Sequence, residues 1–409
     1  MSALVTVAQY RTNWLAVTTV VAAGMVAAMQ VGKVLIASPL LQADLSLDLA
    51  DLGWLTSVFA IIGVVGGMPA GAMVTRIGDR RLLCAGMAIL ILGILVGAAS
   101  EWFALLIASR FLEGFGFVLV VVAGPAVLMR IVSSRQRDVV FALWSCFMPA
   151  GMALALLTGP LVSSWQAIWW MNGVVALISL LLITATVPPS QTKTYDIEGN
   201  FGEDVALTVR SRGPVLLFVI FALYNLMMFT LFSFLPILLV ERLNISLGAA
   251  GILSALITLA NVAGNITAGS LLSRGFSHGR LVIIAALLMG ASGAWVFLVQ
   301  SDETTTVALC VLFSAIGGLI PATLISSVPI LSPRPRLAPM TMGLLMQGSN
   351  LGQLIGPVAV GSAIEAYGWT SGATFLGVSA IACTLLAPML EGTLRAKSGQ
   401  RAAILQNRI

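Results

Sequence analysis

Charged side chains are scarce in this chain, and that scarcity excludes an ordinary soluble domain. Asp, Glu, Lys and Arg make up 9% of the 409 residues, whereas 59% of the residues are hydrophobic. In a typical globular domain about a quarter of the residues are charged. The sequence instead contains twelve apolar stretches, each near the roughly 20 residues that a helix needs to cross a bilayer. We therefore expect an all-α polytopic membrane protein with twelve transmembrane helices.

The apolar stretches follow one another along almost the whole chain. An open strand edge would leave backbone groups unpaired in lipid, and the residue alternation of a membrane barrel is missing, so each stretch is predicted to be a helix. The predicted spans are residues 14–41, 53–75, 81–99, 103–129, 138–162, 166–188, 214–240, 247–273, 279–300, 305–331, 338–364 and 370–392.

Residues that carry enzyme and metal chemistry are also rare. The one histidine, His278, falls in an expected loop, and the four cysteines lie isolated inside apolar stretches. Neither residue type has the spacing of a metal site, and no Walker A loop is present to bind ATP. The basic residues are scattered between apolar stretches, which does not favour nucleic acid as a partner. We expect neither an enzyme nor a metal or other cofactor.

The basic residues are distributed unevenly between the two sets of loops. With the N-terminus placed in the cytoplasm, eighteen of the 21 Lys and Arg residues fall on the cytoplasmic side, and the outer loops carry acids such as Asp44 and Glu101. Cytoplasmic loops of membrane proteins show this excess of Lys and Arg. We therefore expect both termini in the cytoplasm and a multi-pass protein of the bacterial inner membrane.

A polar stretch at residues 189–213 divides the chain. We expect an N-terminal six-helix half at residues 1–188, a cytoplasmic linker at 189–213 and a C-terminal six-helix half at 214–409. The halves share a pattern: Gly71 and Arg76 after the second span recur 198 residues later after the eighth span. Two six-helix repeats in one orientation are typical of transporters that rock one half against the other.

The repeated loops read Gly71-Ala-Met-Val-Thr75-Arg76-Ile-Gly78-Asp79-Arg80-Arg81 and Gly269-Ser-Leu-Leu-Ser-Arg274-Gly275-Phe-Ser-His278-Gly279-Arg280. They resemble the signature loop of the major facilitator superfamily, Gly-x-Leu-x-Asp-Arg-x-Gly-Arg-Arg. The stretch Arg110-Phe-Leu-Glu113-Gly114-Phe-Gly116 in the fourth span, and Gly159-Pro160 in the fifth, are similar to further motifs of that family. The resemblance implies that family's fold and secondary transport.

The resemblance also implies a conformational-switch role for eight loop residues: Gly71, Arg76, Gly78, Asp79, Arg80, Gly269, Arg274 and Arg280. One departure concerns the signature acid, because Thr75 occupies its position and an acid appears at Asp79. That departure puts the family's cytoplasmic latch in question. Among the family's branches, Gly53-Trp54 and Asn350-Leu-Gly352-Gln353 are weakly similar to the cyanate and nitroimidazole permeases.

Three charged side chains are expected at membrane depth: Lys33, Arg110 and Glu113. Charges at this depth usually face a bundle interior or a watery cavity. Lys33 and Arg110 each lie about eight residues, or roughly 12 Å, below the outer end of their spans. Since the resemblance implies that the first and fourth helices line the cavity, we expect both cations to bind an anionic substrate. The alternative for Lys33 is snorkelling to the outer interface.

The neighbours of these charges leave several readings open. Gln30 lies on the face of Lys33 and is expected either to contact the substrate or to contact another helix. Arg110 and Glu113, three residues apart, can form a bracing salt bridge. Glu113 is alternatively a proton-coupling site, since it is the one carboxylate at depth, or a direct ligand contact.

The second half has amides and hydroxyls at depth rather than charges. Tyr224, Asn225 and Asn350 are expected to contact the substrate. The stripe Gln347, Asn350 and Gln353 on the eleventh span has a second interpretation as a helix–helix contact. Asn261 and Asn265 lie one turn apart in the eighth span, and polar side chains in lipid must face protein or water.

The sequence therefore predicts a secondary active transporter that moves a small, anionic organic solute by alternating access, coupled to protons as a symporter. The expected partners are that solute, protons and the lipid bilayer, with the protein acting as a monomer. A proton-coupled drug or multidrug exporter is the alternative within transport. A non-transporting membrane sensor is the alternative of another class, although no loop is long enough to hold an added soluble domain.

Overall fold

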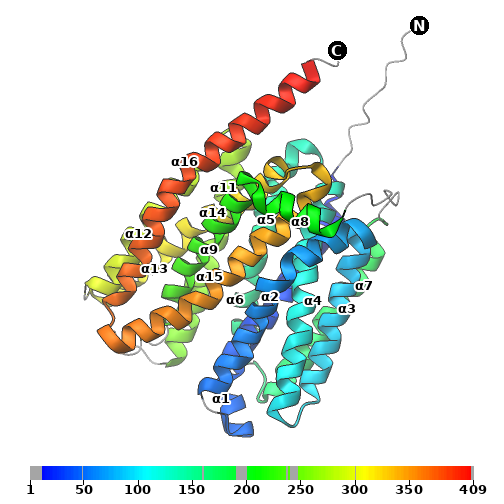
Figure 1. The fold of residues 1–409 in the computed structure, drawn as a ribbon. Coiled ribbons are helices and arrows are strands. Elements are labelled where there is room, and N and C mark those ends of the chain that lie inside the picture. The colour runs from blue at the N-terminus through cyan, green and yellow to red at the C-terminus, as the bar shows by residue number, and fades with distance from the viewer. Residues whose placement is uncertain are drawn as a thin grey trace.

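The computed structural model is helical throughout the residues that it describes, which are 12–47, 49–158, 161–189, 200–235, 238–239, 247–299 and 301–406 (Figure 1). Within these ranges, eleven helical segments are long and apolar enough to cross a membrane. Helix α15 (Ala338–Tyr367) is not one of the eleven, although its 30 residues exceed the length required. It carries the predicted stripe Gln347, Asn350 and Gln353.

The N-terminal helices form one side of the molecule. They are α1 (Trp14–Leu45), α2 (Leu49–Ile77), α3 (Asp79–Ala98), α4 (Phe103–Ile131), the short η1 (Ser134–Gln136), α5 (Arg137–Ser145), α6 (Phe147–Thr158) and α7 (Trp165–Thr186). The expected fifth span is thus two helices that meet at Cys146. Pro149 explains the break, because it has no N–H to donate to the carbonyl of Ser145.

The C-terminal helices form the other side. They are α9 (Arg212–Phe232), α11 (Leu247–Ser273), α12 (His278–Leu298), α13 (Glu303–Gly317), α14 (Leu319–Leu331), the short η3 (Pro335–Leu337), α15 and α16 (Ser371–Gln406). The expected tenth span is also broken, at Gly318. The cause is the same, since Pro321 cannot donate to the carbonyl of Gly317.

The expected linker contains a helix, α8 (Phe201–Arg210), whereas residues 190–199 lie outside the described part of the chain. A bidentate ion pair holds helix α8 in place. The Arg336 guanidinium of η3 donates to both carboxylate oxygens of Asp204, at 2.7 and 2.6 Å. The helix therefore sits against the start of α15.

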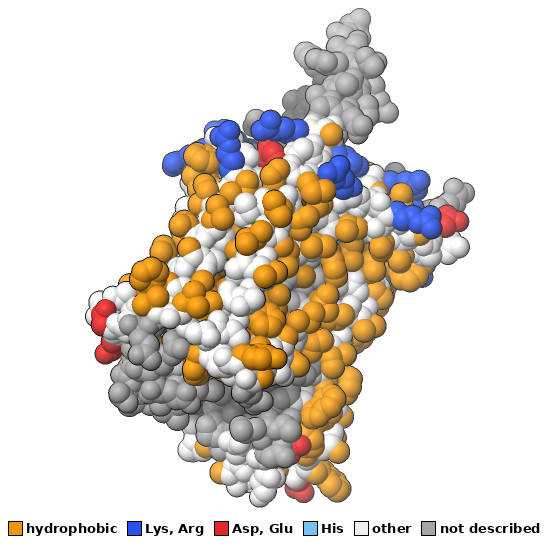
Figure 2. Space-filling model, turned by 60° about the vertical axis from the view of Figure 1, so that its left-hand side comes forward, with side chains coloured by type: hydrophobic (Ala, Val, Ile, Leu, Met, Phe, Trp, Pro, Cys, Tyr) orange, Lys and Arg blue, Asp and Glu red, His pale blue; other side chains and the backbone are white. Residues whose placement is uncertain are grey.

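The surface has the polarity of a membrane protein. In Figure 2 a broad hydrophobic surface separates an end rich in Lys and Arg from an opposite end that carries acidic side chains. The start of α1 and the C-terminal end of α16 lie toward the basic end. We call this end, with Arg130, Arg210, Arg336 and Lys397, the basic end. The distribution agrees with the excess of Lys and Arg predicted for one side.

Two seams join the halves near the basic end. Helix α2 packs along α15, and α11 packs on α5 and α6. Gly71 of α2 fits against Pro339 and Met340 of α15, where an added Cβ would collide with backbone. Its repeat partner, Gly269 of α11, lies equally close to Ala142 of α5. The two glycines of the repeated loops thus occupy equivalent places, one in each seam.

A side chain also crosses the first seam. The Gln347 amide of α15 donates to the backbone carbonyls of Val64, at 2.6 Å, and Val65, at 3.3 Å, in α2. The Val65 carbonyl has no partner in its own helix, because the residue four positions on is Pro69 and lacks an N–H. Gln347 therefore satisfies a carbonyl that proline leaves free. This contact fits the helix–helix interpretation of the stripe.

Candidate substrate pocket and buried ion cluster

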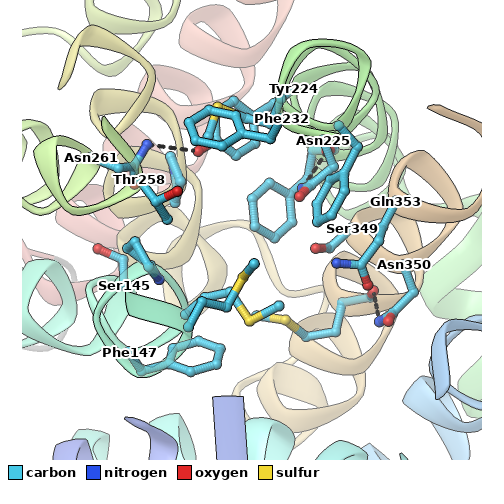
Figure 3. Close-up of a pocket in the computed structure, with 18 of the residues that line it drawn as sticks. Ser145, Phe147, Tyr224, Asn225, Phe232, Thr258, Asn261, Ser349, Asn350 and Gln353 are labelled. Carbon is cyan, nitrogen blue, oxygen red and sulfur yellow. Dashed lines mark hydrogen bonds between the residues drawn. The ribbon is translucent and has the colours of Figure 1, made fainter. Parts of the chain in front are cut away.

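A pocket lies between the two halves, with an empty volume of about 880 Å³ that includes the part open to solvent. The N-terminal half contributes α4, α5 and α6, and the C-terminal half contributes α9, α11, α14 and α15 (Figure 3). The lining residues are Phe117, Ser145, Phe147, Met148, Pro149, Met152, Phe221, Tyr224, Asn225, Met228, Phe229, Phe232, Thr258, Asn261, Pro321, Ile325, Met346, Ser349, Asn350 and Gln353.

The pocket wall combines apolar surface with neutral polar groups. Aromatic rings and methionines dominate it, and none of its described lining residues carries a formal charge. The polar groups come mainly from the C-terminal half, on α9, α11 and α15. Figure 3 shows Tyr224 and Asn261 meeting on one side, with Ser349 and Asn350 on another. An apolar cavity with a few convergent polar groups is the usual form of a small-molecule site.

The three predicted membrane charges meet in one ion cluster, formed by Lys33, Arg110 and Glu113, inside the N-terminal half. The Lys33 ammonium lies 2.7 Å from one carboxylate oxygen of Glu113, and the Arg110 guanidinium pairs with the other oxygen. The side chains are buried, with exposed fractions of 0%, 1% and 0% for Lys33, Arg110 and Glu113. With both bases protonated and the acid ionised, the ion cluster has a net charge of +1.

Neighbouring helices complete the ion cluster. The Lys33 ammonium lies 4.3 Å from the ring centroid of Trp169 on α7, and the Arg110 guanidinium lies 4.8 Å from that of Phe59 on α2. Arg110 Nε also donates to the Leu55 carbonyl at 3.2 Å. Cations placed over aromatic faces are stabilised by the ring quadrupole. The ion cluster therefore ties α1, α2, α4 and α7 together.

Gln30 belongs to the surroundings of the ion cluster. Its amide nitrogen donates to the Val26 carbonyl at 2.9 Å and to the Asn172 side-chain oxygen on α7 at 3.3 Å. The side chain is fully buried. Of the two readings of Gln30, this contact matches the one between helices.

The pocket and the ion cluster are separate in this structure. Lys33, Arg110 and Gln30 do not line the pocket, contrary to the expected cavity-facing arrangement. Two rings stand between them: Phe117 lines the pocket and lies 4.8 Å from Phe59, centroid to centroid, and Phe59 in turn covers Arg110. The remaining predicted contacts, on the C-terminal half, do lie in the pocket wall: Tyr224, Asn225 and Asn350.

The acid of the first repeated loop contacts its own half. Asp79 begins α3 after Gly78, which has a positive φ of 96°, and accepts from Arg130 of α4 at 2.7 and 3.1 Å. Arg80 donates to the Thr184 carbonyl of α7 at 2.6 Å. These contacts brace α3, α4 and α7. The side chains of the other predicted loop arginines are exposed: Arg76, Arg274 and Arg280.

The sequence reasoning missed most of the apolar wall. Phe147, Met148 and Met152 of α6 were not proposed as substrate contacts, because they carry no polar group that stands out in an apolar span. A signal was nevertheless present in Pro149, which breaks the span beside these residues and itself lines the pocket.

Comparisons with known proteins place this architecture among transporters. The model of the Major Facilitator Superfamily matches residues 20–338 and 217–405. The 3-(3-hydroxy-phenyl)propionate transporter of Escherichia coli is 27% identical over 56% of this chain and 57% of its own length. The methyl viologen resistance protein SmvA of Salmonella typhimurium is 26% identical over 48% of this chain and 40% of its own. The chain thus spans about half the length of these curated relatives.

A solved structure shares the fold over nearly the entire chain. The human organic anion transporter MFSD10 superposes with a TM-score of 0.80, covering 92% of this chain and 99% of that one at 18% identity. Together with the apolar helices, these likenesses identify a multi-pass membrane protein. The match of the family model to both halves shows that this chain belongs to the Major Facilitator Superfamily.

Proposed function

We propose that this protein is a secondary transporter for a small organic anion with an apolar, aromatic-sized body, bound between the halves and moved by alternating access. The observation that carries the proposal is the pocket, because both halves build it and its apolar wall contains a few convergent polar groups. A site shared by two six-helix repeats changes its access when the repeats rock.

The ion cluster behind the Phe59–Phe117 pair supports a negative charge on the transported solute. Its net positive charge in a low-dielectric surrounding attracts an anion toward the pocket. The family relatives support the same chemistry in part, since one is named for the transport of a phenylpropionate and a neighbouring structure for organic anions.

Drug export is the second candidate, and the same pocket favours it. The wall is rich in Phe and Met and carries no charge among its described residues, which suits apolar cations as well as apolar acids. A relative named for methyl viologen resistance belongs to this class.

Ligand-induced stabilisation separates the two candidates. The purified protein is heated with 3-phenylpropionate or with methyl viologen, and its melting temperature is followed. A ligand at 100 times its Kd stabilises the folded state by about 2.7 kcal/mol. We expect 3-phenylpropionate to raise the melting temperature and methyl viologen to leave it unchanged. The reverse result would assign the protein to drug export, and uptake by proteoliposomes under a proton gradient then tests transport itself.

For proton coupling we propose Glu113 as the proton site. Its carboxylate contacts the two cations Lys33 and Arg110. Protonation of Glu113 changes the net charge of the ion cluster from +1 to +2, so a proton and an anion favour each other's binding. This mutual preference corresponds to symport.

A double substitution tests this coupling with the net charge held constant. Lys33→Met with Glu113→Gln leaves Arg110 alone, so the ion cluster keeps its charge of +1 but has lost its acid. We expect transport by the double variant to be independent of pH between 5 and 8, and the single variant Lys33→Met, which keeps Glu113, to retain pH dependence. Uptake of 3-phenylpropionate in proteoliposomes measures both. A double variant with the wild-type pH profile rules Glu113 out as the proton site.

A further inference from the structure

A chain of buried amides on α11 ends at the pocket wall. The Asn265 side-chain nitrogen donates to the Asn261 side-chain oxygen at 2.8 Å. The Asn261 nitrogen donates to the Ser314 carbonyl at 2.9 Å and to the Tyr224 hydroxyl oxygen at 3.2 Å. Asn265, Asn261 and Tyr224 are 0%, 2% and 4% exposed. The Asn261 amide is therefore held with its oxygen toward Asn265 and its nitrogen toward Tyr224.

This orientation decides what Tyr224 presents to the pocket. Its hydroxyl oxygen accepts from Asn261 (Figure 3). The hydroxyl proton is therefore directed elsewhere. A phenol has one proton to donate, and among the described residues no acceptor for that proton is found. The Phe221 ring stacks on the Tyr224 ring, with centroids 5.8 Å apart and planes inclined by 8°, which limits the ring's movement.

Four other polar groups of the wall donate a hydrogen bond within their own helices. The amides of Asn225 and Asn350 donate to carbonyls four residues earlier, at 3.0 and 2.7 Å. The hydroxyls of Ser145 and Thr258 do the same to nearby carbonyls, both at 2.7 Å. The Tyr224 hydroxyl differs from these four groups because its single proton has no acceptor among the described residues while its oxygen is held by Asn261.

We propose that Asn261, itself held by Asn265, orients the Tyr224 hydroxyl as a hydrogen-bond donor to an acceptor oxygen of the transported solute. Asn261 is then a positioning residue. The Tyr224 hydroxyl, on the wall formed by the C-terminal half, donates to a carboxylate or carbonyl group of the solute. The apolar body of the solute lies toward Phe147 and Met152 of the other half. This inference rests on the proposed function and specifies which end of the solute each half binds.

The test compares two ligands of similar shape and opposite hydrogen-bonding character. 3-Phenylpropionate offers acceptor oxygens, whereas 3-phenylpropylammonium offers only donors. We expect Tyr224→Phe to weaken binding of the acid roughly tenfold or more, because a hydrogen bond to a charged group is lost. Any binding of the ammonium ligand stays unchanged. Isothermal titration of the purified full-length protein gives the Kd values.

A double-mutant cycle separates positioning from a general structural role. If Asn261 acts through Tyr224, Asn261→Ala weakens acid binding in the wild-type background but adds nothing to Tyr224→Phe. Asn261→Ser takes its place should the alanine variant not purify in folded form. Thr267→Val is the matched control: Thr267 also lies on α11 and bonds within its own helix, but it is outside the pocket wall, so the acid's Kd is expected to stay unchanged.

The possible failures are distinguishable. If the wild-type protein binds no aromatic acid, the proposed function and this inference fall together. If it binds the acid and Tyr224→Phe binds it equally well, the inference alone is overturned. Additive losses for Asn261→Ala and Tyr224→Phe refute the positioning role of Asn261.

Discussion

Replacing Glu113 by Ala is expected to destabilise the folded bundle by about 3–5 kcal/mol, because it leaves the charges of Lys33 and Arg110 buried without their counter-ion. Both cations pair with this one carboxylate, and all three side chains are excluded from solvent. Replacing Lys33 by Met is expected to cost only about 1 kcal/mol, since Arg110 and Glu113 remain as a neutral pair. The melting temperature of each purified variant in detergent measures the difference.

The prediction depends on the order of the two effects more than on their size. A carboxylate shared by two bases is the member that the ion cluster cannot lose, whereas either base is replaceable. Lys33→Met/Glu113→Ala serves as the control, because removing one charge of each sign returns the net charge to +1 and is expected to recover part of the lost stability. Equal losses for the two single variants would contradict the shared-carboxylate arrangement.

Much of the fold could be predicted because lipid permits few alternatives. Each apolar stretch had to become a helix, and the 198-residue repeat placed Gly71 and Gly269 in equivalent positions, which are the two seams of the structure. The breaks at Cys146 and Gly318 were not predicted, although Pro149 and Pro321 mark them. Hydropathy measures how apolar a segment is, and it is insensitive to a missing backbone donor.

The site was predicted less completely than the fold. Scarcity identified the three membrane charges, and they do come together, since buried charges seek partners. The rarity of charge in the spans does not reveal whether a buried charge pairs with a solute or with another side chain. In this structure Glu113 satisfies both cations, and Phe59 and Phe117 lie between Arg110 and the pocket. Most of the pocket wall consists of apolar side chains. In the sequence these residues cannot be told from the lipid-facing apolar residues of the same spans.

Gly67→Ala is expected to stop transport, because the added methyl group keeps the two halves apart at the basic end. A Cβ at Gly67 would collide with the Gly343 backbone of α15, as would a Cβ at Gly343 with Gly67. Overpacking of this kind costs about 1–3 kcal/mol, which falls on the state in which α2 and α15 are in contact. The neighbouring Gly66 is the matched control, because its added Cβ would lie 3.6 Å from Val118, an ordinary contact.

Uptake and thiol labelling together check this seam. Met340, at the start of α15, is 2% exposed and packs against Gly71, so a cysteine there reports whether the basic end is closed. With Met340→Cys as background, we expect Gly67→Ala to abolish uptake and to speed labelling by a water-soluble maleimide by about tenfold, whereas Gly66→Ala changes neither. The hydrogen bonds from the Gln347 side-chain amide to the Val64 and Val65 carbonyls lie in the same seam. Gln347→Leu removes them and should speed labelling as well. Wild-type uptake by Gly67→Ala, or labelling no faster than in the Met340→Cys background, would contradict this prediction.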